Sequence, residues 1–455
     1  MSTKLAALTV LVLAATVAPS LSAAPPVAAA PAGRPTPTPT SAPSARLVTG
    51  PIAAGQSDGP AFRDVDVPQL GKVGADKLRA HAIRPANVVG VESDKGPEGL
   101  TVSEVIRPKV VLAPTAPKVN LDTLSERLHA SLSGTTYGYA MQIRKNGQPA
   151  VTRIWKKARG ASDGNAAWNL DTRMHIASVS KFITAVAMVK MLDAKGISVD
   201  AKIAPYLLAS WVKGTNVDKI TFRQLLRHTS GFRTDSSASD FATMKWWTMI
   251  GVGNNNGTKD YENMNFGLCR ILLSTVGGLP NNLAFNDATY DYVTIETFRK
   301  YVQDNVFTPS NVVGVSFAPV PFKTDALAYS SASDSSGWNS GDLASMAGGA
   351  AFRLSINELL DFMGTFRRKG TIVSVNRAQE ILDQGLGLDV VDDTPAGRIY
   401  DKNGRWRNSG NTEQSLAMFL PNEMELAIFV NSPIGAGEGA NLRSTVRAAY
   451  DASIK

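Results

Sequence analysis

A serine and a lysine three positions apart carry the strongest chemical signal in this sequence. Ser178 and Lys181 lie near the start of an apolar segment, residues 176–194, that we expect to be a helix. Residues three apart on a helix share a face, so the Ser178 hydroxyl and the Lys181 amine can meet. A serine hydroxyl becomes a strong nucleophile when a nearby base takes its proton. The pair therefore predicts nucleophilic catalysis by Ser178, with Lys181 as the proton acceptor.

Lys181 can act as this base only if its amine is uncharged at neutral pH. The ordinary pKa of lysine is about 10.4, and lowering it by roughly three units needs about 4 kcal/mol of destabilisation of the charged form. Burial and a second cation nearby can supply this destabilisation. Residues 182–192 are apolar around most of the helix circumference, and such a helix is a buried one. The alternative is a chance pattern whose lysine reaches solvent.

Tyr261 and Asn263 form a second candidate group, directly before a predicted helix at residues 266–273. A phenol that loses its proton near two lysines can help to activate Ser178, and a phenol that keeps it can protonate a leaving group. The Asn263 amide can orient a substrate carbonyl. The structural alternative is a capping turn, in which Asn263 or Asn265 starts the helix.

Lys402 and Gly404 form a third group, inside a predicted strand at residues 399–406. A strand can lay its backbone along an extended substrate, and a glycine lets the substrate approach closely. The backbone N–H of Arg405 can pair with that of Ser178 as an oxyanion hole. The structural alternative is an ordinary polar strand.

Three phrases of the sequence resemble the serine β-lactamase and penicillin-binding protein family, most closely its class C β-lactamase and esterase branch. They are Ile176-Ala-Ser-Val-Ser-Lys181, Leu225-Leu-Arg-His-Thr-Ser-Gly231 and Tyr261-Glu-Asn-Met-Asn-Phe266. The S-x-x-K pattern of the first phrase contains a serine nucleophile in this family. The resemblance covers residues 120–455, about three quarters of the chain.

The resemblance implies a role for each group. Ser178 is the acylated nucleophile, and Lys181 and Tyr261 are its general bases. Lys402 anchors a substrate carboxylate or tunes the pKa of its neighbours. The turn from His228 to Gly231 is structural.

The third motif departs from the family pattern. It usually reads K-T-G or H-x-G, and here it reads Lys402-Asn403-Gly404. The missing threonine hydroxyl weakens the case for binding the carboxylate of a β-lactam and favours an ester or peptide substrate. A competing register, residues 408–410 (Asn-Ser-Gly), lacks the cation, and we prefer Lys402 because two predicted strands follow it in the family's order.

The elements that must position these groups follow from periodicity. Asn146-Gly147 is a strong turn signal between two strand-like segments, which predicts a β-hairpin. Strands come first and last with a mostly helical block between them, so the fold class is α+β, with an antiparallel sheet flanked by helices. The resemblance implies a β-lactamase/transpeptidase-like arrangement. We expect the helical block to form an inserted subdomain at about residues 200–345. We expect strands at residues 137–144, 150–156, 399–406, 415–420 and 425–431, and helices at 121–131, 176–194 and 441–453.

The N-terminal quarter differs in composition from the rest of the chain. Residues 1–24 are typical of a secretory signal peptide, with Lys4 before an apolar stretch and small residues at 22–24. An uncleaved membrane anchor is the alternative. Residues 25–119 are a Pro/Ala-rich linker and an extension to which we assign no fold. We expect a serine hydrolase domain at 120–455, a secreted or periplasmic location, and no transmembrane span in the mature chain.

Charge and rare residues exclude several classes of function. The net charge of +8 favours anionic surroundings, such as an anionic cell envelope as a partner, and it is equally explained by solubility alone. The basic residues are not clustered with aromatics, so we expect no nucleic-acid binding. The single cysteine, Cys269, has no partner within the chain and lies in an apolar run, which predicts a buried, inert thiol. The four histidines are not paired at ligand spacing, so we expect no metal and no cofactor.

The sequence therefore predicts an exported serine hydrolase that acts through an acyl-enzyme on a small-molecule or peptide ester or amide. Carboxylesterase, D-alanyl peptidase and β-lactamase activities share this chemistry. A G-x-S-x-G pattern around Ser57 offers another serine nucleophile, but it lacks the strand and helix that a nucleophile elbow needs. The alternative from another class is a non-catalytic cell-envelope-binding protein that retains the fold.

Overall fold

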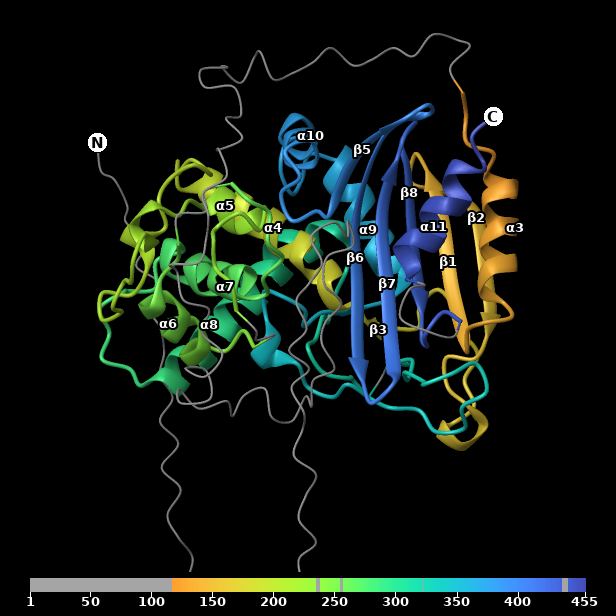
Figure 1. Ribbon diagram of the computed structural model, residues 1–455, viewed down its shortest axis with the longest axis horizontal. Helices are drawn as coiled ribbons and strands as arrows, with labels where there is room; N and C mark the ends of the chain where they lie inside the picture. The colour runs from red at the N-terminus through yellow and green to blue at the C-terminus, as the bar shows by residue number, and fades with distance from the viewer. Residues whose placement is uncertain (1–116, 235–237, 254–256, 322, 436–440) are drawn as a thin grey trace, which may run out of the picture. The chain divides into compact units, whose positions relative to one another are not determined.

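A six-stranded antiparallel sheet unites the two ends of the described chain. The computed structural model describes residues 117–455, except 235–237, 254–256, 322 and 436–440. The strand order is β2-β1-β8-β7-β6-β5, so the pairing of β1 with β8 joins the early hairpin to the late strands (Figure 1). The strands are β1 (Gly138–Lys145), β2 (Gln148–Lys156), β5 (Val390–Thr394), β6 (Gly397–Asn408), β7 (Asn411–Leu420) and β8 (Met424–Val430).

The first hairpin forms for the reason that the sequence indicates. Asn146 and Gly147 both have positive φ, 52° and 80°. A two-residue turn of this kind matches the twist of the strands that it joins. Side chains of β1 then alternate between the two faces: Tyr139 and Met141 enter one core, and Ala140 enters the other. The predicted β-hairpin is confirmed.

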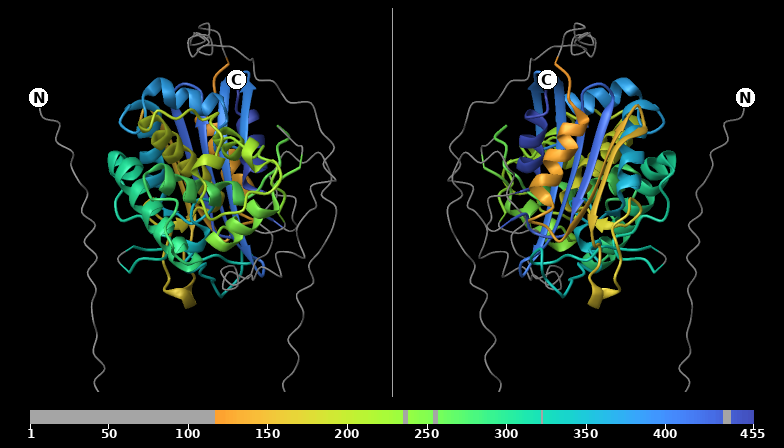
Figure 2. Two further views of the ribbon diagram at one scale, coloured as in Figure 1. Left: turned by 90° about the vertical axis from the view of Figure 1, so that its left-hand side faces the viewer. Right: turned by 90° about the vertical axis from the view of Figure 1, so that its right-hand side faces the viewer.

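Two helices from opposite ends of the described chain cover one face of the sheet. They are α3 (Leu121–Leu132) and α11 (Leu442–Asp451). Figure 2 shows α3 in front of the sheet in its right-hand view. The Asn120 side chain accepts a hydrogen bond from the Thr123 N–H at 2.8 Å and so caps the start of α3. Leu124, Leu128 and Leu132 lie on one stripe of α3 and are fully buried in this core.

The other face packs against α4 (Ser180–Ala194) and α9 (Ile356–Arg368). Twelve of the fifteen residues of α4 are buried, which confirms the predicted buried helix. Four helices, α5 (Phe222–Leu226), α6 (Phe241–Ile250), α7 (Met264–Val276) and α8 (Asp287–Val302), lie to the side of α4 that is away from the sheet (Figure 1). The limits predicted for a helical subdomain stay a prediction.

Several short elements complete the fold. The sequence did not indicate β5, because its residues Val390–Thr394 are mostly exposed and form an edge strand. A small second sheet pairs β3 (Met174–His175) with β4 (Arg353–Leu354), and α10 (Val375–Asp383) follows α9. No helix among the described residues is both long and apolar enough to cross a membrane. The predicted signal peptide and the Ser57 pattern lie outside the described residues.

Candidate active site

Ser178 lies in a tight turn that leads into the buried helix α4. The predicted helix from residue 176 is wrong at its start, because residues 177–179 form a single 3-10 turn and α4 begins at Ser180. Ala177 has a φ of 46°, in the left-handed region, and this strains a residue with a side chain. Two hydrogen bonds hold the turn: the Ile176 N–H donates to the Phe352 carbonyl at 3.0 Å, and the Ser415 hydroxyl donates to the Ile176 carbonyl at 2.6 Å.

Lys181 is fully buried and reaches the nucleophile. Its Nζ lies 2.9 Å from Ser178 Oγ, 2.7 Å from Asn263 Oδ1 and 2.9 Å from the Gly349 carbonyl oxygen. Burial lowers the pKa of the Lys181 amine well below its ordinary value, the positive charge of Lys402 lowers it further, and Asp389 opposes the change. The structure thus gives the amine the dry surroundings that a lysine base requires.

The hydrogen-bond partners of Lys181 fit the uncharged amine. A neutral amine has two N–H groups and one lone pair. The Asn263 Oδ1 and Gly349 carbonyl oxygens only accept hydrogen bonds, so they take the two N–H groups. In the uncharged amine, the lone pair is then left to accept a hydrogen bond from the Ser178 hydroxyl, whose Oγ lies 2.9 Å from Nζ. Asn263 occupies the N-cap position of α7 but makes no capping hydrogen bond there, so its side chain serves this site and not the helix end.

Tyr261 contacts the nucleophile from another side. Its hydroxyl donates a hydrogen bond to Ser178 Oγ at 2.6 Å. Its ring centroid lies 5.0 Å from Lys181 Nζ and 4.8 Å from Lys402 Nζ. Burial raises the pKa of the phenol well above its ordinary value, and the negative charge of Asp389 raises it further. The phenol therefore keeps its proton in this geometry and acts as a donor; a role as a base stays a prediction.

Lys402 is paired within the chain. It is 1% exposed, and its Nζ lies 2.5 Å from Asp389 Oδ1. Arg443 also contacts Asp389, and its Nε lies 2.9 Å from Asp401 Oδ1. Burial lowers the pKa of Lys402 to about 8, against the pull of Asp389. Burial opposes ionisation of Asp389, but Lys402 and Arg443 hold the pKa of its carboxyl far below the ordinary value.

Asp389 and Arg443 are site residues that the sequence analysis missed. Asp389 directly precedes β5, and Arg443 is the second residue of α11. No motif or spacing marks either one, because their contact with Lys402 exists only once β6, β5 and α11 have come together. The charges of Asp389, Arg443, Lys402 and Asp401 sum to zero. The positive charge of Lys402 is therefore already balanced within the chain when a substrate binds.

Gly404 brings β6 against the nucleophile turn. A Cβ atom at this position would lie 2.3 Å from the Ile176 carbonyl oxygen, closer than real Cβ contacts allow, and 3.1 Å from the Ser178 nitrogen, which is tighter than most Cβ contacts. Glycine is therefore required for this approach. The competing Asn-Ser-Gly register lies at the β6–β7 hairpin end, where Ser409 and Gly410 have φ of 50° and 89°. The oxyanion hole from the Ser178 and Arg405 N–H groups stays a prediction.

The turn from His228 to Gly231 supports Tyr261, as expected of a structural element. The buried His228 ring stacks on the Tyr261 ring, with centroids 4.3 Å apart. Its Nδ1 accepts a hydrogen bond from the Glu262 N–H at 3.1 Å. Burial lowers the pKa of His228 well below its ordinary value, with further lowering by Lys402 and Lys181. The imidazole is therefore neutral, which suits an acceptor at Nδ1.

Two other expectations concern residues away from the nucleophile. Cys269 is fully buried in α7, which confirms the predicted burial, and this burial raises the pKa of its thiol far above the ordinary value. The inertness of the thiol stays a prediction. Within the described part of the chain, no three His, Cys, Asp or Glu residues are arranged to hold a metal ion.

Comparison with known proteins assigns the chain to a family. A family model described as "Beta-lactamase" matches residues 121–451. No curated protein gives a significant match to the sequence.

Solved structures share the fold at low sequence identity. FmtA from Staphylococcus aureus is 14% identical over 75% of this chain and 93% of its own, with a TM-score of 0.55. A β-lactamase/D-alanine carboxypeptidase from Yersinia pestis is 16% identical over 73% of this chain and 95% of its own, with a TM-score of 0.55. A D-stereospecific amidohydrolase from a Streptomyces species is 19% identical over 73% of this chain and 98% of its own, with a TM-score of 0.52. These likenesses confirm the predicted α+β fold.

Proposed function

The chain belongs to the beta-lactamase family, and from its site we propose that it is a serine hydrolase that forms an acyl-enzyme on Ser178. The observation that carries the proposal is the fully buried Lys181 amine, 2.9 Å from the Ser178 hydroxyl, with two acceptor oxygens on its other side. A dry amine with a lowered pKa is a competent base at neutral pH.

In the first half of the reaction, Ser178 is acylated. Lys181 takes the Ser178 proton while Oγ attacks the substrate carbonyl carbon. The N–H groups of Ser178 and Arg405 stabilise the resulting oxyanion. Gly404 allows the close approach of β6 on which this stabilisation depends.

The leaving group departs with a proton. Tyr261 donates its phenolic proton to the leaving oxygen or nitrogen and becomes a phenolate, while Lys181 stays an ammonium. Water then attacks the acyl-enzyme and gives a proton to the Tyr261 phenolate. As the bond between the acyl carbon and Oγ breaks, the Lys181 ammonium returns its proton to Oγ, and Ser178 is restored. The phenolate that forms in the first half is the species in which Tyr261 serves as a second base.

The substrate that we propose is a small-molecule or peptide ester or amide. The Asn263 amide binds Lys181, so its contribution to substrate binding would pass through its N–H₂ group. Lys402 supports the reaction as a charge that lowers the pKa of Lys181. The solved relatives include a carboxypeptidase and an amidohydrolase, which supports acyl transfer from a carbonyl substrate.

We further propose that the enzyme works outside the cytoplasm, close to an anionic cell envelope. The positively charged start, the apolar stretch and the small residues of positions 1–24 support this location, as does the net charge of +8. N-terminal sequencing of protein recovered from the culture medium tests it: a mature chain that starts near residue 25 is expected, and full-length protein held in the cell would contradict export.

Covalent labelling tests the enzyme proposal. A fluorophosphonate probe should label the purified protein on Ser178, as located by peptide mass spectrometry. Ser178→Ala should abolish the label, and Ser180→Ala, two positions away, is the matched control that should keep it. A panel of nitrocefin, a D-Ala-D-Ala peptide and short-chain nitrophenyl esters then identifies the reaction type. A folded protein that no acyl or phosphonyl probe labels would instead be a non-catalytic binding protein.

A further inference from the structure

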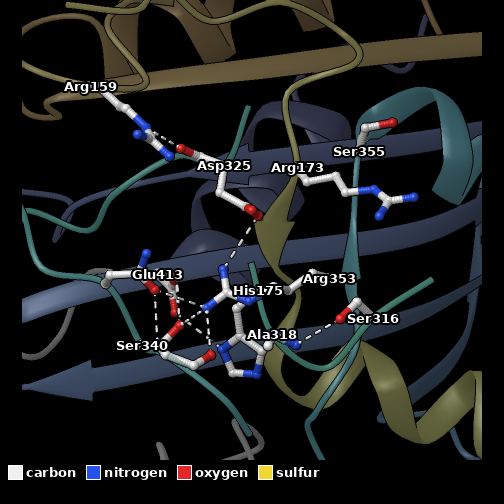
Figure 3. A network of polar contacts seen from close by, with 12 residues as sticks. Arg159, Arg173, His175, Ser316, Ala318, Asp325, Ser340, Arg353, Ser355 and Glu413 are labelled. Atoms are coloured by element: carbon white, nitrogen blue, oxygen red, sulfur yellow. Dashed lines mark hydrogen bonds and ion pairs between the residues drawn. The ribbon is translucent and has the colours of Figure 1, made fainter. Parts of the chain in front are cut away.

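A cluster of buried charged residues surrounds His175, three residues before Ser178 in the sequence (Figure 3). His175, Arg353, Asp325 and Glu413 each have at most 1% of their surface exposed. They come from β3, β4, a loop and β7, which are far apart in the sequence. Since burying a charge is costly unless it is paired, the proton positions in this cluster are constrained.

Both ring nitrogens of His175 face oxygen atoms that accept hydrogen bonds. Nδ1 lies 3.1 Å from Glu413 Oε2, and Nε2 contacts the Ala350 carbonyl oxygen. A neutral imidazole carries one N–H, whereas the imidazolium carries two. With an ionised Glu413, only the imidazolium donates to both partners.

The other charges around His175 support the same protonation state. Arg353, directly across from His175 in the β3–β4 pair, lies 3.4 Å from Asp325. Ser340 connects the two sides, because its Oγ accepts from Arg353 at 2.6 Å and donates to Glu413 at 3.4 Å. With Arg353 balanced by Asp325, the imidazolium is the charge that balances Glu413.

The remaining neighbours do not alter this balance. The Trp406 ring of β6 packs edge-on against the imidazole at 5.3 Å and carries no charge. Arg173, two residues before His175, forms its own pair with Glu358 of α9 at 2.6 Å. Of the described residues, Glu413 and Arg353 are thus the ionisable groups that face the ring, with Asp325 behind Arg353 (Figure 3).

The cluster is joined to the catalytic groups by short segments. Ala350 directly follows Gly349, whose carbonyl oxygen accepts a hydrogen bond from Lys181 Nζ at 2.9 Å. Glu413 and Ser415 are two apart on β7 and share a face, and the Ser415 hydroxyl holds the Ile176 carbonyl of the nucleophile turn. His175 therefore lies between the segment that orients Lys181 and the strand that holds the Ser178 turn.

We propose that His175 is a positioning residue for acyl transfer: as a buried imidazolium between Glu413 and Ala350, it fixes the Gly349 carbonyl against Lys181 and the turn against β7. This inference rests on the proposed function. If the ring loses a proton, one of its two contacts becomes a repulsion between lone pairs. The Lys181 lone pair then loses its alignment with Ser178, while the substrate pocket keeps its shape.

Nitrogen NMR of the imidazole rings tests the proton positions without any need for catalysis. The chain has four histidines, and His175→Gln identifies the His175 signals by their loss. We expect both ring nitrogens of His175 to carry a proton in the folded protein. A neutral His175 ring, with a proton on one nitrogen only, overturns the proposal, and it leaves the labelling of Ser178 unaffected.

Two substitutions of different length test the positioning role. The amide of His175→Gln reaches about as far as Nε2 and can still donate to Ala350, whereas the amide of His175→Asn reaches only as far as Nδ1. We expect single-turnover acylation of Ser178 to fall at least tenfold in His175→Asn and clearly less in His175→Gln, with the KM for a nitrophenyl ester changed less than twofold. His129→Gln is the control, because His129 contacts the Tyr139 hydroxyl on the opposite face of the sheet at 2.7 Å, and it should acylate at the wild-type rate.

The outcomes separate cleanly. Equal losses in the Asn and Gln variants, or acylation at the wild-type rate in both, would refute the role. If neither variant folds, Glu413→Gln provides the test. It removes the negative charge beside Nδ1, so the NMR experiment should show that His175 Nδ1 has lost its proton. An unchanged imidazolium in this variant counts against the proposal. Absence of acylation in the wild-type protein itself would end the proposed function together with this inference.

Discussion

Replacing Lys181 by methionine or by arginine separates its role as a base from its role as a buried side chain. Methionine keeps an unbranched apolar chain and removes the amine. Arginine keeps a positive charge that cannot be shed at neutral pH. Lys190→Met, on the same helix, is the matched control, because the Lys190 ammonium contacts the Ile372 carbonyl and lies away from Ser178.

The magnitudes follow from the burial of Nζ and from its partners. Methionine leaves Asn263 Oδ1 and the Gly349 carbonyl oxygen without this donor, at about 1–3 kcal/mol each. Arginine adds an uncompensated buried charge, which costs about 3–5 kcal/mol. The methionine penalty sums to about 2–6 kcal/mol, and arginine, which is longer than lysine, adds about 1–3 kcal/mol of overpacking to its charge penalty. The midpoints differ by about 2 kcal/mol, so at roughly 2 °C per kcal/mol we expect the arginine variant to melt about 4 °C below the methionine variant.

Acylation and thermal melting are the two assays. Loss of a general base lowers acylation by about 10²–10⁴-fold, so both Lys181 variants should show this loss in a single-turnover measurement with a nitrophenyl ester, and Lys190→Met should not. Near-native acylation by Lys181→Met would show that another group takes the Ser178 proton. An arginine variant as stable as the methionine variant would show that this position tolerates a charge, and the assignment of a dry, neutral amine would fail.

Three further predictions follow from the same geometry. Lys402→Gln removes a positive charge that lowers the pKa of Lys181, so the Lys181 pKa should rise. The acidic limb of the pH profile of acylation should then move to higher pH. A limb that stays in place or moves to lower pH would contradict the electrostatic coupling between the two lysines. Gly404→Ala places a Cβ 2.3 Å from the Ile176 carbonyl oxygen, so we expect acylation to fall at least about 100-fold, and a loss under threefold would show that the turn can move aside. Asp389→Asn breaks a buried ion pair and should destabilise the fold by about 3–5 kcal/mol at neutral pH. Because the folded-state pKa of Asp389 is lowered, its stabilisation is present above the unfolded pKa and is lost as pH falls through the folded pKa. The difference in unfolding free energy between wild type and variant, measured with denaturant, should therefore shrink in acid. A difference that stays constant would argue against the pairing.

Local patterns predicted much of this fold because they act over a few residues. The i, i+3 spacing placed Ser178 and Lys181 on one side of a helix start, and the apolar circumference of the segment predicted its burial. Asn146-Gly147 predicted the hairpin because few other residue pairs adopt positive φ at both turn positions. The order of strands and helices predicted the antiparallel sheet that both ends of the chain build.

The charge state of the site was decided by tertiary contacts. No local pattern marks Asp389, Arg443, His175 or Glu413, since each acquires its role from a partner on another strand or helix. The order of the predicted strands favoured Lys402 over the Asn-Ser-Gly register, and the tertiary structure adds that Gly404 lies against the Ser178 turn. A pKa depends on the water removed and the charges brought within a few ångströms, and these are properties of packed surfaces. The sequence by itself therefore determined which groups can react, and the packing of distant segments determined which of them hold their protons.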